Sequence, residues 1–126
     1  MNAASTLTVM IVDDEAPARS ELKFLLDELG QTEVVAEAAS VREAIEKLKE
    51  YPCDVMFLDV NMPILSGLEA LPRIRAASPQ TAVVMVTGNA TRELVQQAAG
   101  LGACGYVVKP VRPAYVQNFL NKLFKR

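Results

Sequence analysis

Histidine is absent from this 126-residue sequence, and cysteine occurs only twice. Without histidine the chain cannot form a Ser-His-Asp triad, a histidine-ligated zinc site or a histidine general base. It also cannot act as a histidine kinase or as a histidine phosphotransfer protein. Two cysteines, Cys53 and Cys104, are too few for a disulfide framework. Each precedes an apolar run, so we expect both to be small buried side chains.

Long apolar runs are also missing. No stretch approaches the roughly 18 apolar residues of a transmembrane helix, and no basic N-terminal segment resembles a signal peptide. A cytoplasmic location follows as the expectation. The net charge of −2 gives no reason to expect nucleic acid or a membrane as a direct partner. The length fits a single domain over residues 1–126.

Five short runs rich in strand-forming residues alternate with segments of helical periodicity. Most of the runs are continuously apolar, which is typical of strands buried on both faces of a parallel sheet. The expected strands are Leu7–Val12, Glu33–Ala38, Val55–Asp59, Ala82–Val86 and Tyr106–Val108. This alternation predicts an α/β fold, a (βα)5 doubly wound parallel five-stranded sheet with flavodoxin-like strand order 2-1-3-4-5.

The helical segments carry recognisable start signals. Pro17 suits the first turn of the first helix, and Ser66 and Glu69 have capping-box spacing at the start of the third. The expected helices cover residues 17–29, 41–50, 66 onwards, 90–99 and 112–125. Pro72 falls inside the third helical pattern, where it removes a hydrogen bond. We therefore expect that helix either to kink or to begin later.

Polar side chains follow the strands at one edge of the predicted sheet. Asp13 and Asp14 follow the first strand, Asp59 ends the third, and Thr87 and Lys109 follow the fourth and fifth. Open α/β sheets bind ligands beyond these carboxyl ends. Three neighbouring carboxylates need a compensating cation. Because no histidine or cysteine is placed to help, an oxygen-only ligand set favours Mg²⁺, with Mn²⁺ as a surrogate, over zinc.

The same edge suits a phosphoryl group. Lys109 offers a mobile positive charge and Thr87 offers a hydroxyl donor. A carboxylate can itself be the nucleophile and form an aspartyl phosphate. Asp59, at the end of a central strand, is the better candidate, which leaves Asp13 and Asp14 to hold the metal. Taken singly, each residue also has an ordinary structural explanation in a turn, a strand end or a surface.

Several sequence blocks resemble those of a known family. "IVDDE", "DVMFLDVNMPILSGLEAL", "VVMVTGNA" and "GYVVKPV" are similar, in this order, to the signature blocks of the response-regulator receiver domain of the CheY-like superfamily. The resemblance covers essentially the whole chain. The last third, "AAGLGACGYVVKPVRPAYVQNFLNKLF", resembles the single-domain chemotaxis type.

The resemblance implies a role for each residue at the edge. Asp59 would be the phosphoacceptor. Asp14 and Asp59 would bind Mg²⁺ directly, Asp13 would act through water, and the backbone carbonyl of Asn61 would complete the protein ligands. Lys109 would bind phosphoryl oxygens. The Lys109–Pro110 peptide bond would be cis, as is usual in this family.

The resemblance also implies a switch and partners. Thr87 would move toward the phosphoryl group, and Tyr106 would then rotate inward. The donor would be a histidine kinase, a phosphotransfer protein or a small compound such as acetyl phosphate. A downstream protein would bind the face formed by the fourth helix, fifth strand and fifth helix. The chain would act as a signalling domain rather than an enzyme, as a monomer or a phosphorylation-dependent dimer.

Three alternatives remain open. A flavin-binding domain of similar topology would need a phosphate cradle after the first strand, where "DDE" would repel a phosphate. A phosphatase that works through an aspartyl phosphate would need a second titratable Asp two residues after Asp59, where Asn61 stands. Finally, the receiver could be a stand-alone adapter or a part of a transcription factor, cyclase or hybrid kinase.

Overall fold

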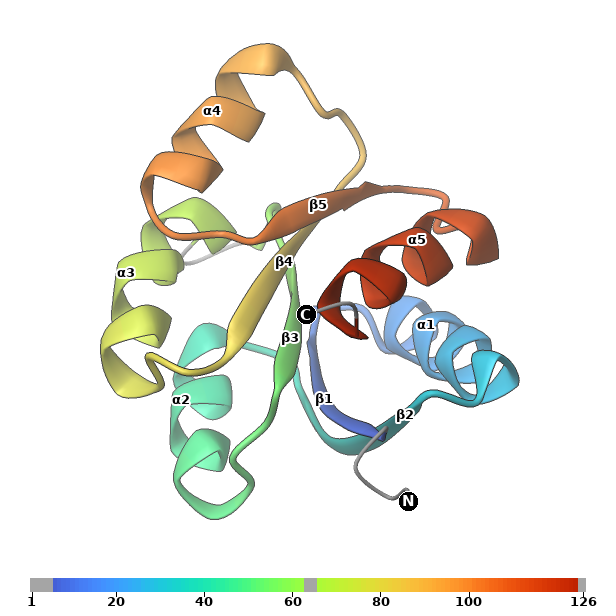
Figure 1. The fold of residues 1–126 in the computed structure, drawn as a ribbon. Helices are drawn as coiled ribbons and strands as arrows, with labels where there is room; N and C mark the ends of the chain where they lie inside the picture. Colours follow the sequence, from blue (N-terminus) through green and yellow to red (C-terminus); the bar gives the residue numbers. More distant parts are fainter. Residues whose placement is uncertain (1–5, 63–65, 125–126) are drawn as a thin grey trace.

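The computed structural model describes residues 6–62 and 66–124, in which five strands alternate with five helices (Figure 1). The strands are β1 (Leu7–Val12), β2 (Thr32–Ala38), β3 (Val55–Asp59), β4 (Ala82–Thr87) and β5 (Gly105–Val108). The helices are α1 (Ala16–Leu29), α2 (Val41–Glu50), α3 (Gly67–Ala77), α4 (Arg92–Gly100) and α5 (Pro113–Phe124). The predicted alternation is confirmed.

All strand pairs are parallel, and the sheet order is β2-β1-β3-β4-β5, as the sequence predicts. Two apolar clusters form the core, one on each face of the sheet. On one face α1 and α5 pack through Leu22, Leu26, Val116 and Leu120. On the other face α2, α3 and α4 cover the sheet, as Figure 1 shows. This doubly wound arrangement brings the carboxyl ends of β1, β3, β4 and β5 to one edge.

Most element boundaries lie within two residues of the expected ones. β2 begins at Thr32, β4 extends to Thr87 and β5 begins at Gly105. α4 begins at Arg92 rather than residue 90, because Thr91 caps it by accepting a hydrogen bond from the N–H of Leu94. The expected end of the fifth helix at Lys125 lies outside the described residues.

The expectation that both cysteines are buried is wrong for one of them. Cys53 is buried, but Cys104 is exposed. Cys104 lies directly before β5, an edge strand of the sheet. The backbone N–H of Cys104 donates a hydrogen bond to the carbonyl of Val83. An apolar run at a sheet edge is covered less completely than one in the centre.

Among the described helices, none is long and apolar enough to cross a membrane.

Candidate functional site

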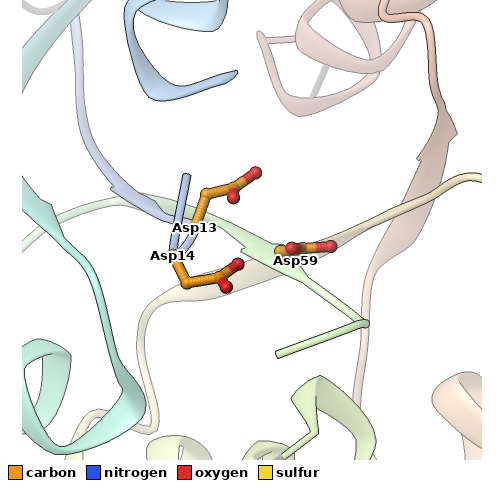
Figure 2. Close-up of side chains that lie close together, drawn as sticks. All are labelled: Asp13, Asp14 and Asp59. Carbon is orange, nitrogen blue, oxygen red and sulfur yellow. The ribbon is translucent and has the colours of Figure 1, made fainter. Parts of the chain in front are cut away.

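Three carboxylates lie together beyond the carboxyl ends of β1 and β3 (Figure 2). Asp13 and Asp14 follow β1, and Asp59 is the last residue of β3. β1 and β3 are adjacent strands with Val12 opposite Leu58, so their ends meet. One oxygen from each carboxylate lies within 4.8 Å of the other two. The predicted convergence of the acidic residues is confirmed.

Asp13 is held by hydrogen bonds from several directions. Its backbone N–H donates to the carbonyl of Ala38 at 3.0 Å, and its carbonyl accepts from Nη1 of Arg19 at 2.6 Å. Its Oδ1 accepts from the backbone N–H of Glu15 at 2.9 Å. Asp13 is buried, whereas Asp14 beside it is exposed. The two acidic neighbours therefore differ in how much of the carboxylate remains available to a ligand.

Lys109 supplies the positive charge of the site. Its Nζ lies 3.4 Å from Oδ2 of Asp13 and 3.5 Å from Oδ1 of Asp59. Burial opposes its charged form, but the attraction of Asp59 and Asp13 outweighs burial and raises the pKa of Lys109. Its backbone N–H donates to the carbonyl of Thr87, and the Lys109–Pro110 bond is cis, as expected. Lys109 is therefore a persistent cation between two acidic groups.

Asp59 is buried and its charge is only partly compensated. Burial is the largest effect and raises the pKa of Asp59, and the nearby charge of Asp13 adds to it. The backbone N–H of Asn61, which donates to Oδ1 of Asp59 at 3.2 Å, and the charge of Lys109 oppose this increase. An ionised Asp59 therefore gains from additional positive charge nearby.

The two expected switch residues lie on neighbouring strands. Thr87 ends β4 and is buried, and its Oγ1 accepts from the N–H of Asn89 at 3.1 Å. Tyr106 is on β5 with its side chain 48% exposed. In this conformation Tyr106 lies outside the core, and Thr87 makes local hydrogen bonds. Inward rotation of Tyr106 stays a prediction.

Two residues near the site were not predicted from the sequence. Arg19 joins the carbonyl of Asp13 to the carboxylate of Glu37, to which its Nε donates at 3.2 Å. Gly67 lies so close to Asp59 that a Cβ atom there would be 2.5 Å from the Asp59 carbonyl oxygen. The "SGLE" capping pattern marks the helix start, but it does not reveal this close approach.

The donor set is chemically suited to a hard divalent cation. Mg²⁺ binds oxygen at about 2.1 Å in octahedral geometry, which places its ligands about 3 to 4 Å apart. The three carboxylate oxygens lie within a similar span of 4.8 Å. Their combined negative charge exceeds the single positive charge of Lys109. The residues present therefore fit Mg²⁺ or Mn²⁺.

The fold and this edge of charged residues are those of a signalling receiver domain. The family model of the response regulator receiver domain matches residues 9–121. The chain therefore belongs to the response-regulator receiver family, as the resemblance of its motifs suggested.

Its similarity to CheY-type receivers covers most of the chain. It is 36% identical over 117 residues to the chemotaxis protein CheY of Thermotoga maritima, covering 93% of this chain and 97% of that protein. The solved CheX–CheY–BeF3–Mg²⁺ complex of Borrelia burgdorferi has a TM-score of 0.86 and 28% identity, over 94% of this chain and 90% of the matched chain.

Other relatives are longer than this chain. An uncharacterised response regulatory protein of Vibrio parahaemolyticus is 40% identical over 119 residues, or 94% of this chain, yet the match spans only 48% of that protein. Sequence similarity therefore relates the chain to one protein that is matched over nearly its full length. It also relates the chain to a response regulatory protein that is about twice as long as the matched segment.

Proposed function

We propose that the chain is a phosphoacceptor receiver in which Asp59 accepts a phosphoryl group in a Mg²⁺-dependent reaction. The observation that carries this proposal is the position of Asp59, a buried carboxylate within reach of Asp13, Asp14 and Lys109. The donor is a partner histidine kinase, a phosphotransfer protein or acetyl phosphate. The CheY of Borrelia burgdorferi was solved with BeF3 and Mg²⁺, which supports this chemistry for the family.

A carboxylate oxygen of Asp59 forms a bond to phosphorus while the bond from phosphorus to the donor atom breaks. The electron pair of the broken bond leaves with the donor, so the product is an acyl phosphate on Asp59. Lys109 stabilises the negative charge on the transferred phosphoryl oxygens, and Thr87 donates its hydroxyl hydrogen to one of them. When bound, Mg²⁺ supplies positive charge that reduces repulsion between the acidic site and the phosphoryl group.

The metal ligands are proposed in two groups. Asp14, Asp59 and the backbone carbonyl of Asn61 would hold Mg²⁺ directly, and Asp13 would act through water. This division is supported by the hydrogen bonds of Asp13, whose Oδ1 already accepts from Glu15 and whose Oδ2 faces Lys109. The exposed Asp14 is the more accessible of the two.

Phosphorylation is then read at the face formed by α4, β5 and α5. Thr87 moves toward the phosphoryl group, Tyr106 rotates inward, and a downstream protein binds the altered face. We treat residues 1–126 as one receiver domain that works as a monomer or as a phosphorylation-dependent dimer. The alternative, a receiver that belongs to a longer regulator, is supported by the longer relatives of this chain.

The test is the intact mass of the protein after incubation with acetyl phosphate. We expect a gain of one phosphoryl group with Mg²⁺, no gain when the metal is chelated, and no gain in Asp59→Asn. A mass that stays constant, or a gain that persists in Asp59→Asn, contradicts the proposal. Catalytic turnover of an aryl phosphate would instead favour a phosphatase.

A further inference from the structure

The turn after β1 carries two of the three carboxylates of the site, Asp13 and Asp14. Asp14 is exposed, and no hydrogen bond or ion pair reaches its side chain from residues 6–62 and 66–124. One of its carboxylate oxygens nevertheless lies within 4.8 Å of oxygens of Asp13 and Asp59 (Figure 2). The position of this carboxylate therefore depends on the backbone of the turn, and in particular on the two peptide groups that flank Asp14.

Both of these peptide groups are held by hydrogen bonds. The peptide that joins Asp13 to Asp14 accepts, through the carbonyl of Asp13, from Nη1 of Arg19 at 2.6 Å. The next peptide donates, through the N–H of Glu15, to Oδ1 of Asp13 at 2.9 Å. The second bond closes within the turn, whereas the first comes from a side chain of α1 and is strengthened by the charge of its donor. Arg19 therefore fixes the turn from outside it.

Arg19 is itself held in place by β2. Its Nε lies 3.2 Å from Oε1 of Glu37, and the two side chains are 18% and 36% exposed. Glu37 lies opposite Ile11 of β1, close to the strand end from which the turn begins. The planar guanidinium can serve two acceptors at once in a fixed geometry, which the single ammonium of a lysine cannot do. Arg19 thus joins the turn, α1 and β2 through one rigid group.

We propose that Arg19 is a positioning residue of the site, which holds the peptide between Asp13 and Asp14 in the orientation from which Asp14 reaches Mg²⁺. This inference rests on the proposed function, because it assigns the support of a ligand in that same site. Groups that orient metal ligands commonly change metal affinity by about 10- to 100-fold when they are replaced. A loss of affinity on removing Arg19 cannot come from its charge, because removing a cation beside acidic residues strengthens their attraction for Mg²⁺.

The test is a calorimetric titration of the full chain with Mg²⁺, in the native form and in Arg19→Met/Glu37→Gln. This double variant removes the donor to the Asp13 carbonyl and leaves the net charge unchanged. We expect its Kd for Mg²⁺ to rise about tenfold. In the metal-free variant the amide shift of Asp14 should also change, because its N–H belongs to the peptide that Arg19 binds.

The matched control is Lys47→Met/Glu43→Gln, which makes the same charge-neutral change in a neighbouring ion pair of 3.1 Å. Lys47 also donates to the carbonyl of Glu37, but neither residue of this pair bonds to the turn after β1. The control should lower stability and still keep the Kd for Mg²⁺ within about twofold of the native value, as expected for the loss of an exposed ion pair. A role of Arg19 in stability alone would give the two double variants the same Kd.

Arg19→Lys is the conservative variant and carries the test if the double variant does not fold. It keeps the charge but offers one donor nitrogen to two acceptors, so its Kd for Mg²⁺ should rise about threefold, less than in the double variant. A native Kd in Arg19→Lys and in the folded double variant, or an equal loss of affinity in the control pair, would overturn the inference. If the native chain binds Mg²⁺ and gains phosphoryl mass while these variants bind equally well, only this inference fails. A native chain that binds no Mg²⁺ would overturn the proposed function as well.

Discussion

At Gly67 the first turn of α3 lies directly against the backbone of the proposed phosphoacceptor. The N–H of Gly67 donates to the carbonyl of Val60 at 2.9 Å. A Cβ atom at this position would be 2.5 Å from the Asp59 carbonyl oxygen and 2.9 Å from the Cα of Val60. Both neighbours are backbone atoms, so no side-chain rotation can relieve the contact. Gly67 therefore fixes how closely α3 approaches the end of β3.

Gly67→Ala should consequently displace Asp59 and lower the free energy of unfolding by about 1–3 kcal/mol, the usual range for overpacking. We expect a reduced rate of phosphorylation by acetyl phosphate as well. The measurements are chemical denaturation and the time course of intact mass. Gly100→Ala is the matched control, because a Cβ there would have no heavy atom within 4 Å apart from its chain neighbours and the backbone of its own helix. Equal effects of the two substitutions would refute the proposed role of Gly67.

A substitution at Lys109 tests whether signalling can be lost while metal binding is kept. Because Lys109 contributes positive charge beside Asp13 and Asp59, Lys109→Ala should retain Mg²⁺ binding, with affinity equal to or higher than that of the native chain. It should nevertheless lose the change in the Tyr106 amide shift that BeF3 and Mg²⁺ produce. Calorimetric Mg²⁺ titration and amide spectra measure the two effects. A normal Tyr106 response in Lys109→Ala would show that the assigned role is wrong, and Lys23→Ala is the control.

The site residues at the carboxyl edge of the sheet were predictable from the sequence, because residues that end neighbouring parallel strands lie at the same edge. Once five strands are recognised, residues such as Asp13 and Asp59 must come to the same edge. Arg19 and Gly67 were not predictable in this way. Their importance arises from a side chain crossing to another segment and from a helix approaching a strand end, and neither leaves a spacing pattern in the sequence.

Among the elements, α3 departs most from simple helix rules. Of the two alternatives expected for this helix, a kink or a later start, the later start is wrong, because α3 begins at Gly67. Ser66 and Glu69 form the predicted capping box. Pro72 lies within this helix and on its exposed side. Because proline has no N–H, the carbonyl of Leu68 cannot receive the usual helical hydrogen bond from this position. The capping box and the buried residues Leu71 and Ile74 stabilise α3 despite this loss.

Pro72→Ala should therefore raise the free energy of unfolding by about 1–2 kcal/mol, since it restores a donor within a helix. The site should not change, because Pro72 is exposed and lies more than one helical turn after Gly67, the residue of α3 that contacts Asp59. Denaturant titration measures the stability and intact mass measures the phosphorylation. Arg73→Ala, at the adjacent exposed position, should stay within about 0.5 kcal/mol of the native chain. Destabilisation by Pro72→Ala would show that proline is favoured at this position.

Element boundaries were less predictable than element types. Periodicity identifies the apolar face of a helix, as for Val41, Ala44 and Leu48 in α2, because burial repeats with the helical turn. The ends depend on single hydrogen bonds such as the Thr91 cap of α4. At β5 the prediction for Cys104 failed because apolar character alone does not tell a central strand from the last strand of a sheet.

For the whole molecule, the acidic edge is a cost to stability that the proposed metal binding would offset. The pKa of Asp59 is raised in the folded chain, mainly by burial and also by Asp13, so folding disfavours the ionised form. The molecule is therefore expected to lose stability from this group as pH rises from the ordinary Asp pKa through the raised one. The loss is complete once the pH exceeds the raised pKa, and it is absent in acid, where Asp59 is protonated in both states.

Asp59→Asn should accordingly be more stable than the native chain at pH 7 without metal, and this advantage should shrink toward acid pH. Mg²⁺ should stabilise the native chain, by about 1.4 kcal/mol at tenfold excess over its Kd, and stabilise Asp59→Asn less. Thermal unfolding of both proteins across pH, with Mg²⁺ or with chelator, measures these differences. Lower stability of Asp59→Asn at pH 7 without metal would contradict the account of the site.

The most direct test of the central claim is to locate the phosphoryl group itself. After reaction with acetyl phosphate and Mg²⁺, borohydride reduces an aspartyl phosphate to homoserine, and peptide mass spectrometry identifies the modified position. The account predicts homoserine at position 59, in a metal-dependent reaction, with Asp13 and Asp14 unmodified. Homoserine at Asp13 or Asp14, or no reduced product from a protein that has gained phosphoryl mass, would contradict it.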